Sequence, residues 1–123
     1  MIAFKYRFHG HGSLRYVYKN GQAIRTHLVT VKYSRNPHRK NPRIGVVVSK
    51  KVLKSAVGRN RIRRRLYEAL RPHITPDLPS YDVVFIVSSS EILAQSPSEL
   101  NALVSDLMAQ ATTYTPDQKN DII

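Results

Sequence analysis

One short segment, residues 57–71, carries more positive charge than any other part of the chain. It contains one asparagine, Asn60, and six arginines: Arg59, Arg61, Arg63, Arg64, Arg65 and Arg71. Apolar side chains recur between them at helical spacing: Ile62, Leu66, Ala69 and Leu70. A guanidinium group is a planar fork that pairs with phosphate and stacks on bases. The segment therefore predicts a helix with one apolar stripe and a surface suited to a nucleic-acid backbone.

The charge of the whole chain is divided unevenly. Residues 1–72 hold 19 of the 20 Lys and Arg and one of the eight acids, whereas residues 73–123 hold one lysine and seven acids. The net charge is +12 and the isoelectric point is near 10.4. Solubility does not require such clustering, so the asymmetry favours a polyanionic partner for the first two thirds of the chain.

The composition limits the class of protein. A length of 123 residues fits one domain, and 41% hydrophobic residues suffice for a modest core. The absence of cysteine excludes disulfides and thiolate metal sites, which makes the reducing cytoplasm the expected location. We expect neither a signal peptide nor a membrane span, because no apolar run is long enough. A basic amphipathic helix can lie on a membrane, but this stripe is narrow and lacks Trp and Phe.

The apolar periodicity predicts an α/β (α+β) two-layer sandwich. The expected elements are a helix over 14–19 capped by Ser13, strands over 23–34, 43–49 and 81–88, the arginine helix ended by Pro72, and a last amphipathic helix. That last helix opens on a capping box, Ser96-Pro97-Ser98-Glu99. Strands 43–49 and 81–88 are apolar enough to be central, and with the helix between them they predict a βαβ unit.

We expect the two longer helices to cover one face of the sheet and to leave the other face partly open beside the first helix. The candidates to line this open face are Tyr16, Tyr18, Lys32 and Tyr33. Aromatic and basic side chains suit unpaired nucleotides, where each stacked base contributes roughly 1–3 kcal/mol. The whole chain is expected to be a single RNA-binding domain, with flexible ends at 1–12 and 113–123.

No convincing catalytic or metal-binding constellation emerges from the residues. His9 and His11 could bind a metal, but no third ligand lies nearby in the sequence. Ser49 beside Lys50 could be read as an activated nucleophile, although its place before a cationic helix favours phosphate contact. The basic part of the chain has no carboxylate pair for metal ions. These features predict a binding module.

The stretch from Arg43 to Arg64 resembles the protein subunit of bacterial ribonuclease P. It reads RIGVVVSKKVLKSAVGRNRIRR, and that family carries Gly-Val-x-Val-Ser-Lys-Lys followed by Ala-Val-x-Arg-Asn-Arg-Ile-Lys-Arg. The flanking elements agree, so that the resemblance covers about residues 13–112. It implies a protein that assists a catalytic RNA, with its bound Mg²⁺, in removing the 5′ leader of precursor tRNA. It also implies that the βαβ crossover is left-handed, against the general rule.

The resemblance also assigns residues. The RNA-binding candidates are Ser49, Lys50, Lys51, Lys54, Arg59, Asn60, Arg61, Arg63, Arg64 and Arg65, and the leader-cleft candidates are Leu14, Tyr16, Tyr18, Lys32 and Tyr33. Catalysis is assigned to the RNA subunit, with no cofactor bound by the protein alone. Three departures stand out. Leu14 replaces a cleft aromatic, and Tyr67 stands where arginine is frequent. The segment Tyr6-Arg7-Phe8-His9-Gly10-His11-Gly12 takes the place of an Arg-Leu-containing segment.

Three alternatives remain open on the sequence. A general RNA-binding or ribosomal-type protein predicts no preference for leader-bearing tRNA. A self-sufficient small nuclease predicts cleavage without an RNA partner. A helix-turn-helix DNA binder requires a second helix that the predicted strands around the arginine helix do not supply.

Overall fold

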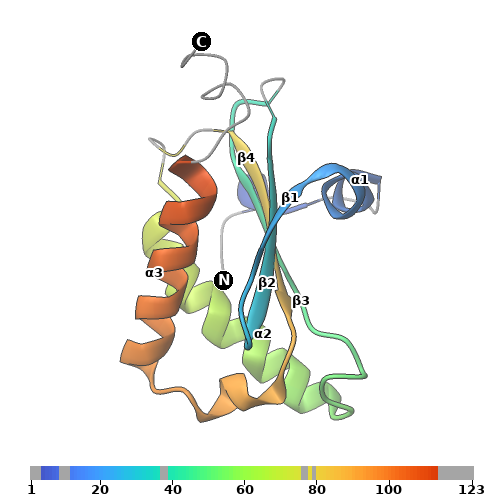
Figure 1. The fold of residues 1–123 in the computed structure, drawn as a ribbon, viewed down its shortest axis with the longest axis vertical. Coiled ribbons are helices and arrows are strands. Elements are labelled where there is room, and N and C mark those ends of the chain that lie inside the picture. Colours follow the sequence, from blue (N-terminus) through green and yellow to red (C-terminus); the bar gives the residue numbers. More distant parts are fainter. Residues whose placement is uncertain (1–3, 9–11, 37–38, 76–77, 79, 114–123) are drawn as a thin grey trace.

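A computed structural model gives the fold of the chain (Figure 1). It describes residues 4–8, 12–36, 39–75, 78 and 80–113. The predicted roles of His9 and His11 lie outside these residues, and so does the predicted flexible end at 113–123, except for Thr113, which ends the last helix. The elements are η1 (Phe4–Tyr6), α1 (Gly12–Asn20), β1 (Gln22–Arg25), β2 (Val29–Arg35), β3 (Arg43–Val47), α2 (Ala56–Leu70), η2 (Arg71–His73), β4 (Tyr81–Val87), η3 (Ser90–Ala94) and α3 (Pro97–Thr113).

The four strands form one sheet in the order β1-β2-β4-β3. β1 and β2 form an antiparallel hairpin, and β2 pairs antiparallel with β4. β3 runs parallel to β4, and α2 connects them, so the predicted βαβ unit is confirmed. The handedness of this crossover stays a prediction.

The prediction that both apolar strands are central is right for β4 and wrong for β3. β4 lies between β2 and β3, whereas β3 is an edge strand whose outer side is met by a single bridge from Arg7 to Ile44. Its apolar run has another cause, because Ile44, Val46 and Val48 all face the core under the helices. An apolar run indicates that a strand is buried, but it does not indicate how many strands lie beside it.

The predicted single strand over residues 23–34 is in fact a hairpin. A turn at Thr26 separates β1 from β2, and its backbone N–H donates to the Val29 carbonyl over 2.9 Å. The Thr26 hydroxyl also bonds the Val29 carbonyl, at 2.7 Å, and accepts from the Val29 N–H. A threonine side chain that satisfies the backbone in this way can close a turn without glycine.

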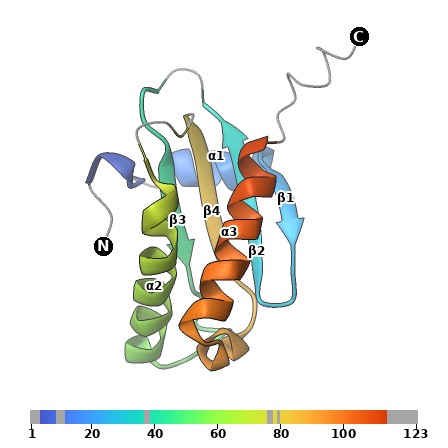
Figure 2. The same cartoon turned by 90° about the vertical axis from the view of Figure 1, so that its left-hand side faces the viewer.

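α2 and α3 cover one face of the sheet, and α1 lies on the opposite face (Figure 2). The core lies between the sheet and the helix pair, as predicted. Its fully buried side chains include Val31, Val83, Phe85, Ile62, Leu66, Leu70, Val104 and Leu107. The fold therefore leaves the α1 side of the sheet without cover from the long helices.

Both long helices begin at a polar side chain. The Ser55 hydroxyl accepts from the Gly58 N–H at 3.1 Å and caps α2. The predicted capping box of α3 is confirmed, because Ser96 accepts from the Glu99 N–H and the Glu99 carboxylate accepts from the Ser96 N–H. In the described part of the chain, no helix has the length and apolarity that a membrane crossing requires.

Candidate nucleic-acid interface

The outer surface of α2 carries arginines that point to solvent. Arg61 and Arg64 are both exposed. Among the residues that the structure describes, neither guanidinium makes a hydrogen bond or an ion pair. Asn60, Arg63, Arg64 and Tyr67 line a hollow of about 350 Å³ on the same helix. Exposed guanidinium groups beside a shallow hollow form a surface that can receive phosphates and bases.

The other arginines of the helix bond to the protein itself. Arg59 donates to the carbonyls of Leu53 and Lys54 at 3.0 and 2.7 Å, which fastens the preceding loop to α2. Arg63 bonds the side-chain oxygen of Asn60. The predicted RNA-binding arginines are therefore of two kinds. Arg61 and Arg64 face solvent, whereas Arg59 and Arg63 bond to the protein itself.

Arg65 departs most from the prediction. Its side chain turns toward α3 and donates to the carbonyls of Leu93, at 3.0 Å, and Gln95. The residue is half-buried, and its donors hold the segment between η3 and α3 against α2. Its position in an arginine run could not reveal this, because the carbonyls that it bonds lie about thirty residues further along the chain.

The loop between β3 and α2 extends the basic surface. Ser49, Lys50, Lys51 and Lys54 are all exposed, and the Ser49 carbonyl accepts from the N–H groups of Val52 and Leu53 in a tight turn. These residues directly precede the first turn of α2, so the structure brings the predicted lysines together with the exposed arginines.

On the opposite face, the structure separates the predicted cleft residues into two groups. Leu14 and Tyr18 are one helical turn apart in α1 and share its edge. The Lys32 ammonium donates to the Tyr18 carbonyl at 2.5 Å and lies 6.0 Å from the Tyr18 ring centroid. Tyr16 lies about 200° around the helix from Leu14, and 60% of its surface is exposed. Leu14, Tyr18 and Lys32 therefore form one surface, and Tyr16 belongs to another.

The prediction that Tyr33 lines this face is wrong. Tyr33 is 5% exposed and belongs to the core under α2 and α3, where it pairs across the strands with Val83. Side chains alternate between the two faces of a strand, so Lys32 and Tyr33 cannot both point to the α1 side.

An aromatic residue that the sequence did not single out for the cleft lies on the α1 side. The Phe8 ring covers Gly45 so closely that a Cβ at position 45 would lie 3.2 Å from the Phe8 Cδ2 atom. Leu14 lies over the same glycine, its Cδ1 atom 3.8 Å from that position. The sequence signal for it was the departure of residues 6–12 from the Arg-Leu segment of the family, together with the loss of an aromatic at Leu14. The pair Phe8–Leu14 keeps one aromatic ring at this end of α1.

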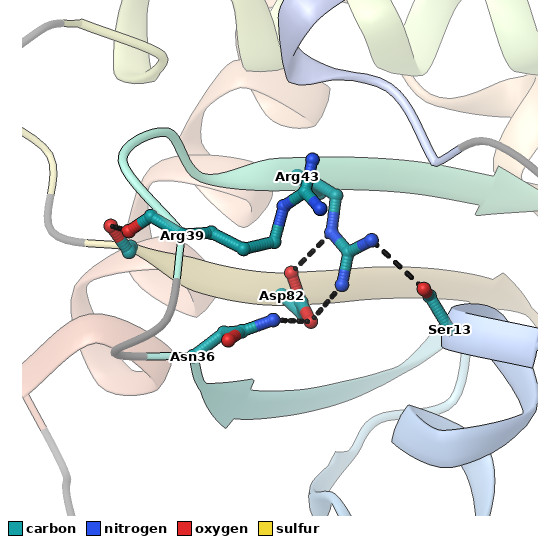
Figure 3. Close-up of polar contacts among 6 residues, drawn as sticks. Ser13, Asn36, Arg39, Arg43 and Asp82 are labelled. Atoms are coloured by element: carbon teal, nitrogen blue, oxygen red, sulfur yellow. Dashed lines mark hydrogen bonds and ion pairs between the residues drawn. The ribbon is translucent and has the colours of Figure 1, made fainter.

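A buried ion pair, also missed by the sequence, joins the elements of this face (Figure 3). Arg43 on β3 donates through Nε and Nη2 to both carboxylate oxygens of Asp82 on β4, at 2.8 and 2.7 Å. Its Nη1 donates to the Ser13 hydroxyl of α1 at 2.9 Å. The prediction that Ser13 caps this helix is wrong, because α1 begins at Gly12 and already includes Ser13. Asn36 donates to Asp82, and the Arg43 guanidinium lies 4.9 Å from the Phe8 ring centroid.

Sequence comparison places this chain in a known family. The model of the ribonuclease P protein family, described as Ribonuclease P, matches residues 3–112. The chain belongs to the ribonuclease P protein family. The ribonuclease P protein component of Carboxydothermus hydrogenoformans is 45% identical over 73 residues, 58% of this chain and 62% of that protein. That of Blochmanniella floridana is 36% identical over 85 residues, 69% of each chain.

The fold of this ribonuclease P family member agrees with a solved relative. The ribonuclease P protein of Staphylococcus aureus superposes with a TM-score of 0.74 at 22% identity, over 87% of this chain and 97% of that one. This likeness shows the mixed α+β fold with its open four-stranded sheet. The chain aligns with less than two thirds of the length of the first curated relative above.

Tyr67, where the ribonuclease P family often has arginine, has a structural partner. The Val46 N–H on the outer edge of β3 donates to the Tyr67 hydroxyl at 3.2 Å. Burial raises the pKa of Tyr67, while this backbone bond and the charges of Arg7 and Arg63 lower it by less. Burial likewise raises the pKa of Tyr18. Both hydroxyls therefore stay protonated at neutral pH.

The described residues contain no cluster of metal-ligating side chains. Within the described ranges, no three His, Asp or Glu side chains gather closely enough to hold a metal ion. The buried carboxylate, Asp82, already accepts from Arg43 through both oxygens.

Proposed function

We propose that this chain is the protein component of a bacterial ribonuclease P, which binds the catalytic RNA and the 5′ leader of precursor tRNA. The observation that carries the proposal is the basic surface made by residues 49–54 and the exposed arginines of α2. It gathers groups that can bind phosphate, and among the described residues no cluster of metal-ligating side chains lies beside them. Family membership supports the assignment of this surface to the ribonuclease P RNA.

The proposed contact surface for the leader is the edge of α1 that carries Leu14 and Tyr18, with Lys32 beneath it and Phe8 next to it. The Tyr18 ring is half-buried and offers a surface on which a base can stack. The Lys32 ammonium can attract the phosphate of an unpaired strand.

In this proposal, hydrolysis belongs to the RNA subunit and its Mg²⁺, and the enzyme as a whole is an endoribonuclease that matures tRNA 5′ ends. The protein contributes affinity: its cations release counterions from RNA and reduce RNA–RNA repulsion. The proposed place of action is the cytoplasm, where precursor tRNA is made in bacteria, and the cysteine-free composition is consistent with it.

The first test is cleavage of precursor tRNA by a bacterial ribonuclease P RNA at low Mg²⁺, with and without the chain, plus a protein-only reaction. Cleavage restored only when both components are present is the expected result. Tight RNA binding without stimulation would support the general RNA-binding reading instead. Cleavage by the protein alone would identify it as a nuclease.

The leader surface is tested by Tyr18→Ala, with Tyr18→Phe as the variant that keeps the ring. We expect Tyr18→Ala to weaken binding of precursor tRNA more than binding of mature tRNA, because only the precursor carries a leader to stack. Equal losses for both RNAs would remove Tyr18 from the leader site.

A further inference from the structure

A second hollow lies on the α1 side of the sheet, on the edge of α1 away from Leu14 and Tyr18. It has a volume of about 550 Å³, within the range of pockets that hold small organic ligands. Its lining comes from the start of α1, the end of β2 and the start of β4: Gly12, Ser13, Tyr16, Ser34, Arg35, Asn36 and Asp82. The proposed leader surface does not include any of these residues.

The wall of this pocket is held by the buried ion pair. Three lining residues, Ser13, Asn36 and Asp82, belong to the hydrogen-bond network of Arg43 (Figure 3). Arg43 and Asp82 are 5% and 3% exposed, so the ion pair at the centre of this network is shielded from solvent. The network joins α1, β3, β4 and the end of β2, and the pocket between these elements is therefore preformed.

The side chain of Tyr16 is exposed and does not contribute to the core. It and Val57 are the two large apolar side chains with the greatest exposure among the described residues. Tyr16 and Arg35 are both exposed and both line the pocket, Tyr16 from α1 and Arg35 from the last position of β2. An exposed ring, a cation and polar groups around one hollow match the parts of a nucleotide: base, phosphate and base edge.

We propose that this pocket binds one unpaired nucleotide by stacking on Tyr16, with its phosphate near Arg35. The proposal rests on the proposed function, since it takes RNA as the partner of this +12 chain. The nucleotide comes either from the leader of the substrate or from the catalytic RNA. The chemistry of recognition is the same for both sources.

The test measures three affinities with the full chain. The first is the affinity of the protein for the ribonuclease P RNA. The other two are the affinities of the holoenzyme for precursor tRNA and for mature tRNA. The variants are Tyr16→Ala, Tyr16→Phe, which keeps the ring, and Ser105→Ala, an exposed control on α3. Loss of a stacked base, about 1–3 kcal/mol, corresponds to roughly 5- to 150-fold weaker binding. Because Tyr16 is exposed, Tyr16→Ala should fold with an unchanged melting temperature.

Weaker binding of precursor but not of mature tRNA by Tyr16→Ala would identify the leader as the source. Weaker binding of the RNA subunit, with an unchanged ratio between precursor and mature tRNA, would identify the catalytic RNA. Both results require Tyr16→Phe and Ser105→Ala to match the wild type. All three affinities within twofold of the wild type, or equal losses in Tyr16→Ala and Tyr16→Phe, would overturn the proposal.

The proposed function can fail separately. In that case the wild type itself would neither stimulate the RNA nor prefer precursor tRNA. Binding of the wild-type protein to hexameric oligouridylate and oligoadenylate, compared with Tyr16→Ala, would then still decide the pocket: a loss of about fivefold or more supports it, and no loss refutes it.

Discussion

The buried ion pair between Arg43 and Asp82 makes a quantitative prediction about stability. Asp82 accepts three hydrogen bonds, two from Arg43 and one from Asn36. In Asp82→Ala the guanidinium stays buried and keeps one bond, to the Ser13 hydroxyl. Two of its donors then face no acceptor, and its charge has no counterion.

The expected loss is large. Removing one partner of a buried pair costs about 3–5 kcal/mol, because the remaining charge is uncompensated. Domains of this size are stable by about 5–15 kcal/mol, so Asp82→Ala removes a large share of the total. With an m value of about 1.5 kcal/mol per molar urea, a loss of about 4 kcal/mol lowers the urea midpoint by about 2.7 M.

The assay is equilibrium urea unfolding followed by circular dichroism and tyrosine fluorescence, since the chain has seven tyrosines and no tryptophan. The double variant Arg43→Met/Asp82→Leu should recover most of the loss, because it leaves no buried charge behind. Glu68→Ala is the control: it breaks a 2.6 Å ion pair with Arg71 whose side chains are more than half exposed, and it should leave the midpoint nearly unchanged. If Asp82→Ala is no worse than Glu68→Ala, or if the double variant is no better than Asp82→Ala, the reasoning is refuted.

Three further predictions concern hydrogen bonds and charge. Tyr67→Phe leaves an edge-strand N–H of β3 without its acceptor and should cost about 1 kcal/mol in urea unfolding; no loss would mean that water replaces the hydroxyl. The Ser96 N–H bond to Glu99 lowers the pKa of that carboxyl, so its stabilising effect is present above the ordinary value of 4.5 and is lost as pH falls through the lowered one. Melting temperatures of Glu99→Gln should therefore fall less steeply with acid than those of the wild type, and parallel curves would contradict this. Arg64→Ala should reduce the salt slope of RNA binding by about 1 at an unchanged melting temperature. Arg65→Ala should lower the melting temperature instead, and the reverse pattern would show that the two roles are exchanged.

Local features of this protein could be predicted from the sequence. The capping box at Ser96, the apolar stripe of α2 and the apolar run of β4 depend on residues close together in the chain. Their physics is short-ranged, because helix caps and amphipathic faces require only neighbours within one or two turns. The same periodicity places the arginines of α2 outside the apolar stripe, but it does not separate those that face solvent from those that bond to the protein.

Side-chain roles that depend on distant partners could not be predicted in this way. Arg65 stands in a run of arginines, yet it bonds carbonyls near residue 95. The aromatic character of Tyr33 predicts the open face, but the alternation of β2, in register with β4, directs this side chain into the core. β3 is at the edge because β4 inserts between it and β2, a choice of topology that hydrophobic patterning does not encode.

The sequence by itself therefore determined the helices, the βαβ unit, the charge of the interface and, through the motif from Arg43 to Arg64, the family. The tertiary structure alone decided which arginines are exposed, that Tyr16 and Tyr18 lie on different edges of α1, and that Arg43 and Asp82 form a pair. The physical reason is range: periodicity and charge are summed along the chain, whereas a buried hydrogen bond requires two groups, 39 residues apart in this pair, to meet within about 3 Å.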